Sequence, residues 1–542
     1  MRICPEKPAR LSWLTGLRGV LLALVAASMV AMASEVKLEL SMLIVRHGDR
    51  AKVALAAEVS VVAAMPCAVD GWPQRSGLYE RRARAKNMAK TLFEEVRSEQ
   101  NVFAAWRHVK RSALASGSPD IRGKASEFEH AHQRHLRRII RQLRSGTLSF
   151  DPVEGVLKDK RKRLAAKKDP RPIAIATIQN RVVQRAILQV LQPRQARDLR
   201  DPDTRFETVR DKRLGRINDV NRSRYGVGGL IYPYGGVRPA IETIMAAIDD
   251  GAKFYFQSDI RSFFTKIPTD RVVSFVQRET GDEALAELFA RALEVHLGNE
   301  AELVGYTHLF PKGGIGVAQG SSLSAFAGNV LLYEMDQTLN NMGVTAVRYI
   351  DDILMVGADV KAINAAKEYA EKTLTDFGFG LYTPSDGPEK AAQGECSQAI
   401  NFLGCTLQPK RCVPSTKSVD NMKEAVRETL ATSKAAIKDA VANGGTLNPK
   451  YSQSASLEAL GKRVYGWQKS FAFCNQRQPF EHLDNFISSQ TLDYHGFIVR
   501  QISKADKRVK TMILGVPSTA AMFDRSKEKA PKKSVLPGRV SS

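Results

Sequence analysis

Two neighbouring aspartates, Asp351 and Asp352, lie inside the apolar segment VRYIDDILMVG at positions 347–357. Adjacent carboxylates in apolar surroundings repel each other and lose hydration, so their charges are costly unless a cation compensates them. Mg²⁺ is suited to this role, because it binds proteins through one or two carboxylates together with substrate phosphates. The alternative is that the pair only forms a hairpin turn, for which aspartate is also suited.

Asp259 can supply a third carboxylate, because it ends the aromatic-rich segment KFYFQSD. If this segment is a strand beside the hairpin, Asp259, Asp351 and Asp352 meet at one end of a sheet. Two Mg²⁺ ions held roughly 4 Å apart there can stabilise the attacking and leaving oxygens of an in-line phosphoryl transfer. The sequence therefore predicts a catalytic two-metal site made of these three aspartates.

The elements that must position these residues follow from the hydrophobic pattern. A strand is expected at 253–260, and two short hairpins are expected at 346–357 and 399–409. Helices are expected at 240–251, 268–279 and 361–378, within 313–343 after a glycine-rich loop, and over most of the chain from 416 onward. This order predicts an α+β domain, an antiparallel sheet with helices on one face.

The net charge points to a polyanionic partner. The 542-residue chain carries a formal charge of +24, with a pI of about 9.8. Basic residues are dense at 132–144 (HQRHLRRIIRQLR) and at 158–171 (KDKRKRLAAKKDPR). Such clusters are typical of nucleic-acid binding, which we favour over a merely solvated basic surface. The length exceeds that of one compact core, so about two to four domains are expected.

The cysteines show no metal-binding pattern. No CxxC pair is present, and no HxxxH motif supplies the rest of a zinc site. We therefore expect free thiols in a reducing compartment. The six residues concerned are Cys4, Cys67, Cys396, Cys405, Cys412 and Cys474.

The first part of the chain gives a conflicting signal. Residues 1–34 resemble a secretory signal peptide, and the segment RHGDR at 46–50 resembles the phosphate-binding signature of histidine acid phosphatases. The downstream acidic partner motif of that family is not found, so an exported phosphatase using His47 is a distant alternative. A start at Met65 or Met88 would remove both features. We expect a cytoplasmic protein without a stable membrane partner, and a plain loop at 117–126, where a phosphate-loop-like spacing is one residue too long.

Five segments in order resemble the motifs of reverse transcriptases. RYIDD at 348–352 is similar to the Tyr-x-Asp-Asp box, and SDIRSFF at 258–264 is similar to the first palm motif. VAQGSSLS at 317–324 resembles the Gln-Gly-x-x-x-Ser block, RPIAIATIQNRVVQRA at 171–186 the fingers block, and INFLGC at 400–405 the primer-grip hairpin. The resemblance covers about residues 145–415 and is greatest to bacterial retron, group II intron and defence-associated enzymes.

The resemblance implies a nucleotide-binding set beside the aspartates. Arg171 would bind the triphosphate, and its guanidinium can fork onto a phosphate. Phe264 would be a steric gate that excludes a ribose 2′-OH, with Phe263 as packing. Gln319, Gly320 and Ser324 would support the nucleotide and template, although Ala325 stands where the family has proline. Lys390 would protonate pyrophosphate, or it is only a solvated lysine.

A second set is implied for the primer and template. Tyr349 would pack beside the primer end, and Leu403 and Gly404 belong to the primer-grip hairpin. Lys462, Arg463 and Trp467 mix basic and aromatic character where a thumb helix would grip a duplex, although a tryptophan such as Trp467 is more often a core residue.

The resemblance implies a right-hand polymerase with fingers, palm and helical thumb, and the function of an RNA-directed DNA polymerase. Its partners would be an RNA template, a DNA or RNA primer, dNTPs and, as a further candidate, a dedicated non-coding RNA. No RNase H or integrase signature follows residue 415, which favours a bacterial retroelement or antiphage defence role. A protein-primed or template-independent polymerase and a non-catalytic maturase-like RNA-binding protein are the alternatives. The expected domains are 1–75 (signal-like extension), 76–145 (basic helical region), 146–415 (fingers and palm), 416–523 (helical thumb) and 524–542 (disordered basic tail).

Overall fold

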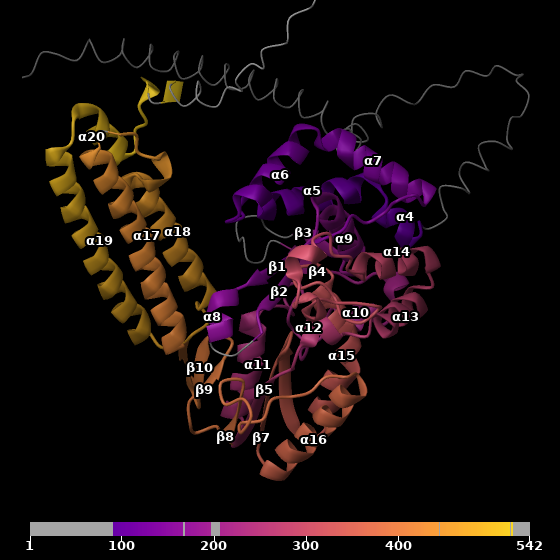
Figure 1. Cartoon of the computed structure of the whole chain (residues 1–542). Coiled ribbons are helices and arrows are strands. Elements are labelled where there is room, and N and C mark those ends of the chain that lie inside the picture. The colour runs from indigo at the N-terminus through magenta and orange to yellow at the C-terminus, as the bar shows by residue number, and fades with distance from the viewer. Residues whose placement is uncertain (1–89, 166–168, 197–205, 444, 521, 524–542) are drawn as a thin grey trace, which may run out of the picture. The chain divides into compact units, whose positions relative to one another are not determined.

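The structure, a computed structural model, describes residues 90–165, 169–196, 206–443, 445–520 and 522–523 (Figure 1). The expected N-terminal extension, with its signal-like and RHGDR segments, and the expected C-terminal tail lie outside these residues. No helix in the described part of the chain is both long and apolar enough to cross a bilayer.

The described chain begins with helices whose starts are fixed by side-chain caps. Thr91, Ser98 and Ser118 each accept a hydrogen bond from a backbone N–H of the first turn, which satisfies donors that the helix leaves unpaired. Ser118 caps helix α6, which begins at Pro119 and takes in most of the segment 117–126, so the expectation of a loop there was wrong. The helices are α4 (Leu92–Val96), α5 (Glu99–Leu114), α6 (Pro119–His130) and α7 (His132–Ser145).

A small hairpin and a buried helix follow. Strands β1 (Glu154–Lys158) and β2 (Arg171–Ile175) pair antiparallel, with Lys158 opposite Arg171. Helix α9 (Ile178–Leu191) begins after the Thr177 cap and ends before Pro193. The short elements nearby are α8 (Lys160–Ala165), β3 (Arg194–Ala196), β4 (Phe206–Thr208), η2 (Lys212–Leu214) and α10 (Ile217–Val220).

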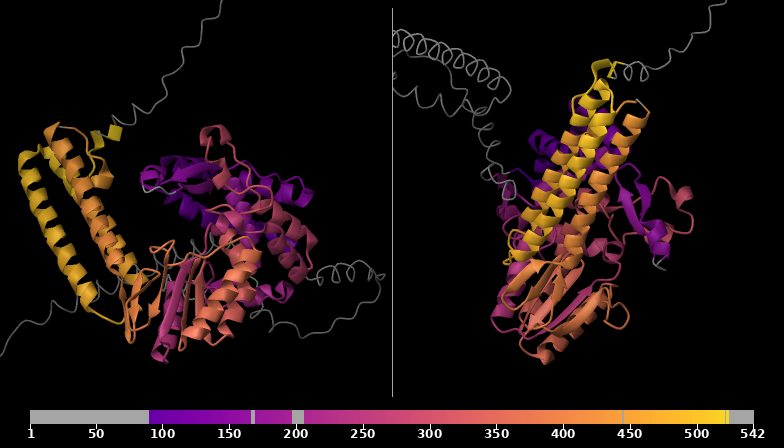
Figure 2. Two further views of the ribbon diagram at one scale, coloured as in Figure 1. Left: turned by 60° about the horizontal axis from the view of Figure 1, so that its bottom comes forward. Right: turned by 90° about the vertical axis from the view of Figure 1, so that its left-hand side faces the viewer.

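The central sheet has four antiparallel strands in the order β6-β7-β5-β8 (Figures 1 and 2). The predicted hairpin is present, and the predicted strand lies beside it with Asp259 opposite Asp352. The fourth strand, β8, was not predicted. The strands are β5 (Phe254–Asp259), β6 (Val344–Tyr349), β7 (Asp352–Gly357) and β8 (Ala391–Glu395).

Both faces of this sheet are covered, so the expectation of helices on one face was wrong. Ile353 and Met355 of β7 are buried in the core that also contains residues of α15 (Ser324–Asn340) and α16 (Val360–Asp376). Leu354 and Val356 point the other way because side chains alternate along a strand. They pack with α11 (Val237–Asp249) and with a second antiparallel sheet, ordered β11-β10-β9. Its strands are β9 (Ile400–Phe402), β10 (Cys405–Gln408) and β11 (Arg411–Pro414).

The remaining chain is mostly helical. The long C-terminal helices pack lengthwise around their own apolar core (Figure 2). Inside this core the hydroxyls of Ser433 and Tyr494 lie 2.7 Å apart.

Together, the two antiparallel sheets and the surrounding helices confirm the predicted α+β class. The other elements are α12 (Phe263–Lys266), α13 (Thr269–Thr280), α14 (Glu283–Leu293), η3 (Glu300–Leu303), η4 (Thr307–Leu309), α17 (Thr416–Ala442), η5 (Pro449–Tyr451), α18 (Gln453–Ser470), α19 (Gln478–Lys504) and α20 (Lys507–Leu514).

Candidate active site

The paired aspartates occupy different positions of the β6–β7 hairpin. Ile350 and Asp351 form its two-residue turn, whereas Asp352 is already the first residue of β7. Ile350 has a φ of 65°, which a β-branched residue rarely adopts. Such strain costs of order 1–3 kcal/mol and persists only where the surrounding structure enforces it. The turn is therefore held in place by its neighbours.

Asp259 reaches the same end of the sheet. It is paired with Asp352 across β5 and β7, and directly opposed residues of an antiparallel pair have Cβ atoms about 5 Å apart. The Ile260 N–H also donates to the Asp351 carbonyl at 2.8 Å. The carboxylate oxygens of all three aspartates do not come within 4.8 Å of one another in the described structure. Asp259 instead forms an ion pair with a neighbouring cation.

That cation is Lys390, which forms an ion pair with Asp259. A backbone hydrogen bond also holds Lys390 beside Asp259, because the Asp259 N–H donates to the Lys390 carbonyl at 3.0 Å. Lys390 immediately precedes β8, so the unpredicted strand is what brings it to the site. Lys390 therefore pairs with a carboxylate of the site, and its role with pyrophosphate stays a prediction.

The two hairpin carboxylates are held where their charge is unfavourable. Burial raises the pKa of Asp351, and the charge of Asp352 raises it further. Burial also raises the pKa of Asp352. Arg171 and Arg348 act in the opposite direction on Asp351, so Arg171 lies within electrostatic reach of the site. The donor set fits Mg²⁺, because it offers only carboxylate oxygens and its negative charge is not fully compensated.

A buried ion pair, which the sequence analysis missed, supports the hairpin. The Arg348 guanidinium donates to both carboxylate oxygens of Asp336, at 3.0 and 2.6 Å, and both side chains are almost fully buried. Arg348 also donates to the Ile350 carbonyl at 2.9 Å, in the strained turn. An arginine in an otherwise apolar strand and an aspartate in an apolar helix could have signalled this pair, since buried charges need partners.

A glycine-containing loop, residues 223–236, closes around this ion pair. A Cβ at Gly226 would lie 2.4 Å from Asp336 Oδ2 and 2.6 Å from Arg348 Nη2, so glycine is required there. The Asn329 side chain donates to the Gly228 carbonyl at 2.7 Å. A backbone hydrogen bond also joins the loop to the hairpin, because the Val227 N–H donates to the Arg348 carbonyl at 2.9 Å.

The residues expected to bind the nucleotide lie on neighbouring segments. Gln319 is half-buried, and its carbonyl accepts the N–H of Ala174 in β2, the strand that begins at Arg171. The neighbouring Gly320 has a φ of 113°. Ser324 is buried, and its hydroxyl donates to the Ala318 carbonyl at 2.7 Å, so it holds the loop at the start of α15.

Phe263 and Phe264 differ as the sequence analysis assumed. Phe263 is buried, and its ring packs on Phe379 with centroids 5.5 Å apart. Phe264 is only partly buried, and its carbonyl accepts the Val317 N–H at 2.6 Å. This bond ties the backbone of Phe264 to the loop that leads to Gln319. The assignment of Phe264 as a steric gate stays a prediction.

The residues expected to contact the primer lie around the β9–β10 turn. Leu403 and Gly404 form this turn with φ values of 48° and 82°, the pattern of the tight hairpin turn that suits strand twist. The Gly404 carbonyl accepts from the Ser415 N–H and the Ser418 hydroxyl, both at 2.8 Å, which attaches the turn to α17. Tyr349 packs partly buried against the same core as Leu403.

The three residues expected on a thumb helix all lie on α18, but they have different surroundings. Lys462 is exposed and pairs with Glu458 one turn earlier. Arg463 donates to the Ala425 carbonyl of α17 at 3.1 Å. Trp467 is partly buried and packs on Phe471, with ring centroids 4.9 Å apart, so it contributes to the helical core.

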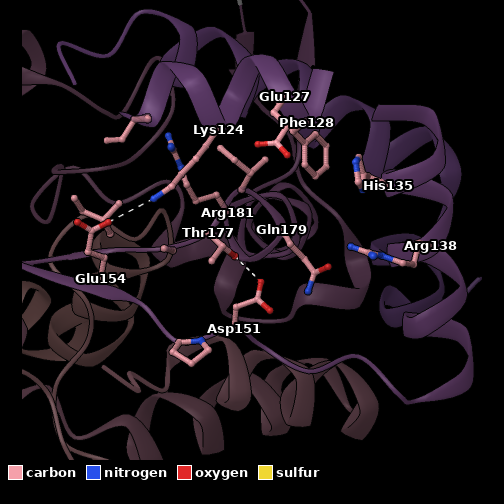
Figure 3. A pocket seen from close by; sticks show the side chains of 15 residues that line it. Lys124, Glu127, Phe128, His135, Arg138, Asp151, Glu154, Thr177, Gln179 and Arg181 are labelled. Carbon is pink, nitrogen blue, oxygen red and sulfur yellow. Dashed lines mark hydrogen bonds and ion pairs between the residues drawn. The ribbon is translucent and has the colours of Figure 1, made fainter. Parts of the chain in front are cut away.

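A pocket of about 420 Å³ lies elsewhere, between α6, α7 and the start of α9 (Figure 3). Its lining mixes bases such as Lys124 and Arg138 with acids such as Glu127 and Asp151. Thr177 donates to Asp151 at 2.8 Å within it. None of the residues expected to act in catalysis lines this pocket, and its charges largely compensate one another.

Comparisons with known proteins identify the domain. The family model for reverse transcriptase (RNA-dependent DNA polymerase) matches residues 157–407. Solved structures of a partial and a complete Cas6-RT-Cas1–Cas2 complex match at 17% and 12% identity, with TM-scores of 0.29 and 0.30. They cover 53% and 75% of this chain, which in turn covers 42% and 50% of theirs.

A telomerase from Candida albicans, in complex with a fragment of telomeric RNA, matches at 12% identity with a TM-score of 0.30. That match covers 68% of this chain and 67% of the telomerase chain. No curated protein matches the sequence. Residues 157–407 therefore match a reverse transcriptase domain, and the chain spans about half the length of the Cas6-RT-Cas1–Cas2 chains that it matches.

Proposed function

We propose that the chain is an RNA-directed DNA polymerase that adds dNTPs to a primer 3′ end by two-metal phosphoryl transfer. The observation that carries this proposal is the meeting of Asp259, Asp351 and Asp352 at one sheet end within the matched domain. Burial raises the pKa of both Asp351 and Asp352, so their charged forms need a compensating cation, which Mg²⁺ would supply.

Each residue has a separate part in the reaction. The three aspartates would hold Mg²⁺, which when bound supplies charge neutralisation and polarises the phosphoryl oxygens. Arg171 would orient the triphosphate by forked hydrogen bonds. Lys390 would lie beside the departing pyrophosphate, since it already contacts Asp259. The strained Ile350 turn, fixed by Arg348, would keep Asp351 in position without reorganisation during the reaction.

Phe264 would select deoxynucleotides. Its ring is only partly covered, and its backbone is tied to the loop of Gln319, which faces the strand of Arg171. An aromatic ring at this place would crowd a 2′-hydroxyl. Incorporation of rNTPs as readily as dNTPs would show the gate assignment to be wrong.

Two basic surfaces, one on α7 and one around α9, support a nucleic-acid substrate. Helix α7 buries its apolar residues and lines a groove with Arg134, Arg137, Arg141 and Arg144. Helices α5 and α9 pack together. With β3 they carry a second basic cluster, which consists of His108, Arg111, Arg181, Arg185 and Arg194. Positive charge gathered in this way matches a phosphodiester backbone.

The test is primer extension on an RNA template of chosen sequence. We expect complementary cDNA from the wild-type chain and none from the double variant Asp351→Ala, Asp352→Ala. Retained synthesis by the variant would contradict the site assignment. Products unrelated to the template would favour a protein-primed or template-independent polymerase, and RNA binding without synthesis would favour a maturase-like role. A bacterial retroelement or defence context, with a dedicated non-coding RNA, is the setting that we propose from the sequence resemblance.

A further inference from the structure

Three cysteines meet at the junction of the second sheet and the C-terminal helices. Cys405 of β10, Cys412 of β11 and Cys474, between α18 and α19, have sulfurs that all lie within 4.8 Å of one another. The sulfurs of Cys412 and Cys474 are 3.7 Å apart. A disulfide would need about 2.05 Å, so these are thiols that have not been oxidised to one another.

The backbone holds Cys474 in this place. The Asn475 N–H donates to the Cys412 carbonyl at 3.1 Å, and the Asn475 side chain accepts from the Cys412 N–H at 2.9 Å. The same side chain donates to the Lys410 carbonyl at 3.1 Å. The segment after α18 is therefore fastened along β11 by directional bonds, and the approach of the third sulfur is imposed by the fold.

The sulfur spacing matches a tetrahedral metal site. Two sulfurs bound at about 2.3 Å from Zn²⁺ at the tetrahedral angle lie about 3.8 Å apart. The observed 3.7 Å equals this edge within the spread of such sites. Cys405 and Cys412 are buried, whereas Cys474 is partly exposed, so the open side of the cluster is on the Cys474 side. Water can complete a fourth position there, as in zinc sites with three protein ligands.

Cysteine binds a metal ion as its thiolate, so each of these thiols would release its proton on binding. Cys396, also buried, is not a member of the group and serves as an internal reference.

We propose that Cys405, Cys412 and Cys474 bind a thiophilic divalent metal ion of the type of Zn²⁺. The ion fastens the segment after α18 to the β9–β11 sheet. This assignment replaces the expectation of unrelated free thiols, which rested on spacing along the sequence. Because Cys405 directly follows the Leu403–Gly404 turn, the ion would also steady that turn. A consequence for primer holding rests on the proposed function, whereas metal binding itself does not.

The experiment measures metal content rather than activity. The full chain, purified with reductant and supplied with zinc, should retain about one equivalent after gel filtration. Co²⁺ in its place should give the intense thiolate charge-transfer absorption of a tetrahedral cobalt site. Cys474→Ser should lose both signals, Cys474→His should keep bound metal because imidazole is also a ligand, and Cys396→Ser should behave as wild type.

Three results would overturn the proposal. One is a reduced, folded wild-type chain that binds neither ion. Another is Cys474→Ser retaining the wild-type equivalent of zinc. The third is a cluster that forms a disulfide and excludes metal even with reductant present. Asp351→Ala with Asp352→Ala should keep the zinc while losing polymerisation, so failure of the metal site and failure of the proposed function are told apart.

Discussion

Two regions of this molecule gather like charge, and they do so in opposite ways. At the hairpin, Asp351 and Asp352 are partly buried, and burial raises the pKa of both. In the basic cluster of α5, α9 and β3, no carboxylate of the described residues forms an ion pair with His108, Arg111, Arg181, Arg185 or Arg194. Partial burial and these arginines lower the pKa of His108 to about 4.

The difference lies in what holds the charges. The hairpin is fixed by a buried ion pair, a strained turn and close backbone contacts. Among the described residues the basic cluster has neutral partners, such as Ser112, which accepts from Arg181 at 3.1 Å, and the Phe206 ring, 4.2 Å from Arg194. A rigid, desolvated site can select a small ion, whereas an adaptable cluster suits a long polyanion.

The largest effect is expected from removing a carboxylate at the hairpin end of the sheet. Asp259→Asn should lower the rate of primer extension at least about a thousandfold, since metal stabilisation of the transition state is worth several kcal/mol. The control is Asp386→Asn, at an exposed aspartate that pairs with Arg261. If Asp259→Asn kept most of the rate in single-turnover extension, the site would be wrongly assigned.

Breaking the buried ion pair should cost the most stability. Arg348→Met leaves Asp336 uncompensated and should lower the free energy of unfolding by about 3–5 kcal/mol, measured by denaturant titration. Adding Asp336→Leu should recover much of that loss, because an apolar pair can replace a buried ion pair. Extension should remain impaired in the double variant, which still lacks the bond to Ile350. Full recovery of activity would show that Arg348 has no positioning role.

The basic cluster should contribute through salt-dependent affinity. Arg181→Gln with Arg185→Gln should weaken RNA binding about tenfold and reduce the log–log salt slope by about one for each phosphate that is no longer neutralised. Arg238→Gln is the matched control, because Arg238 already pairs with Glu242. An unchanged slope in fluorescence anisotropy titrations would mean that the cluster does not face nucleic acid.

The smallest effect is a gain in stability without metal. Burial raises the folded-state pKa of Asp351 above its unfolded value of about 4. The stabilisation that this shift gives to the folded state is complete below the unfolded pKa. It is lost as the pH rises through the folded-state pKa and the buried carboxylate becomes charged. In chelator at pH 7, Asp351→Asn should therefore raise the free energy of unfolding by about 1 kcal/mol, and this gain should vanish near pH 4. A variant that is less stable at pH 7 would contradict the sign.

The sequence predicted much of the sheet, for reasons that can be named. The strands of Asp259 and of the hairpin carry dense apolar and aromatic residues, and they were located correctly. Strand β8 has the sequence AAQGE, with low strand propensity, and it was missed although it brings Lys390 to Asp259. Its place is set by pairing with β5, a tertiary contact that local pattern does not contain.

Other residues were missed because their partners are distant in the sequence. Cys474 meets Cys412 only through the docking of the segment after α18, so spacing rules for zinc could not identify the group. The two covered faces of the central sheet were also not foreseen. Leu354 and Val356 gave a signal, since a strand with apolar residues on both sides is buried on both.

The most direct test of the central claim is single-turnover extension of a primer on a defined RNA template with dNTPs and Mg²⁺, comparing wild type with Asp352→Asn. We predict cDNA complementary to the template from the wild-type chain and no detectable extension by the variant, with both proteins folded and both binding the primed RNA. Template-complementary cDNA from Asp352→Asn at the wild-type rate would contradict the account.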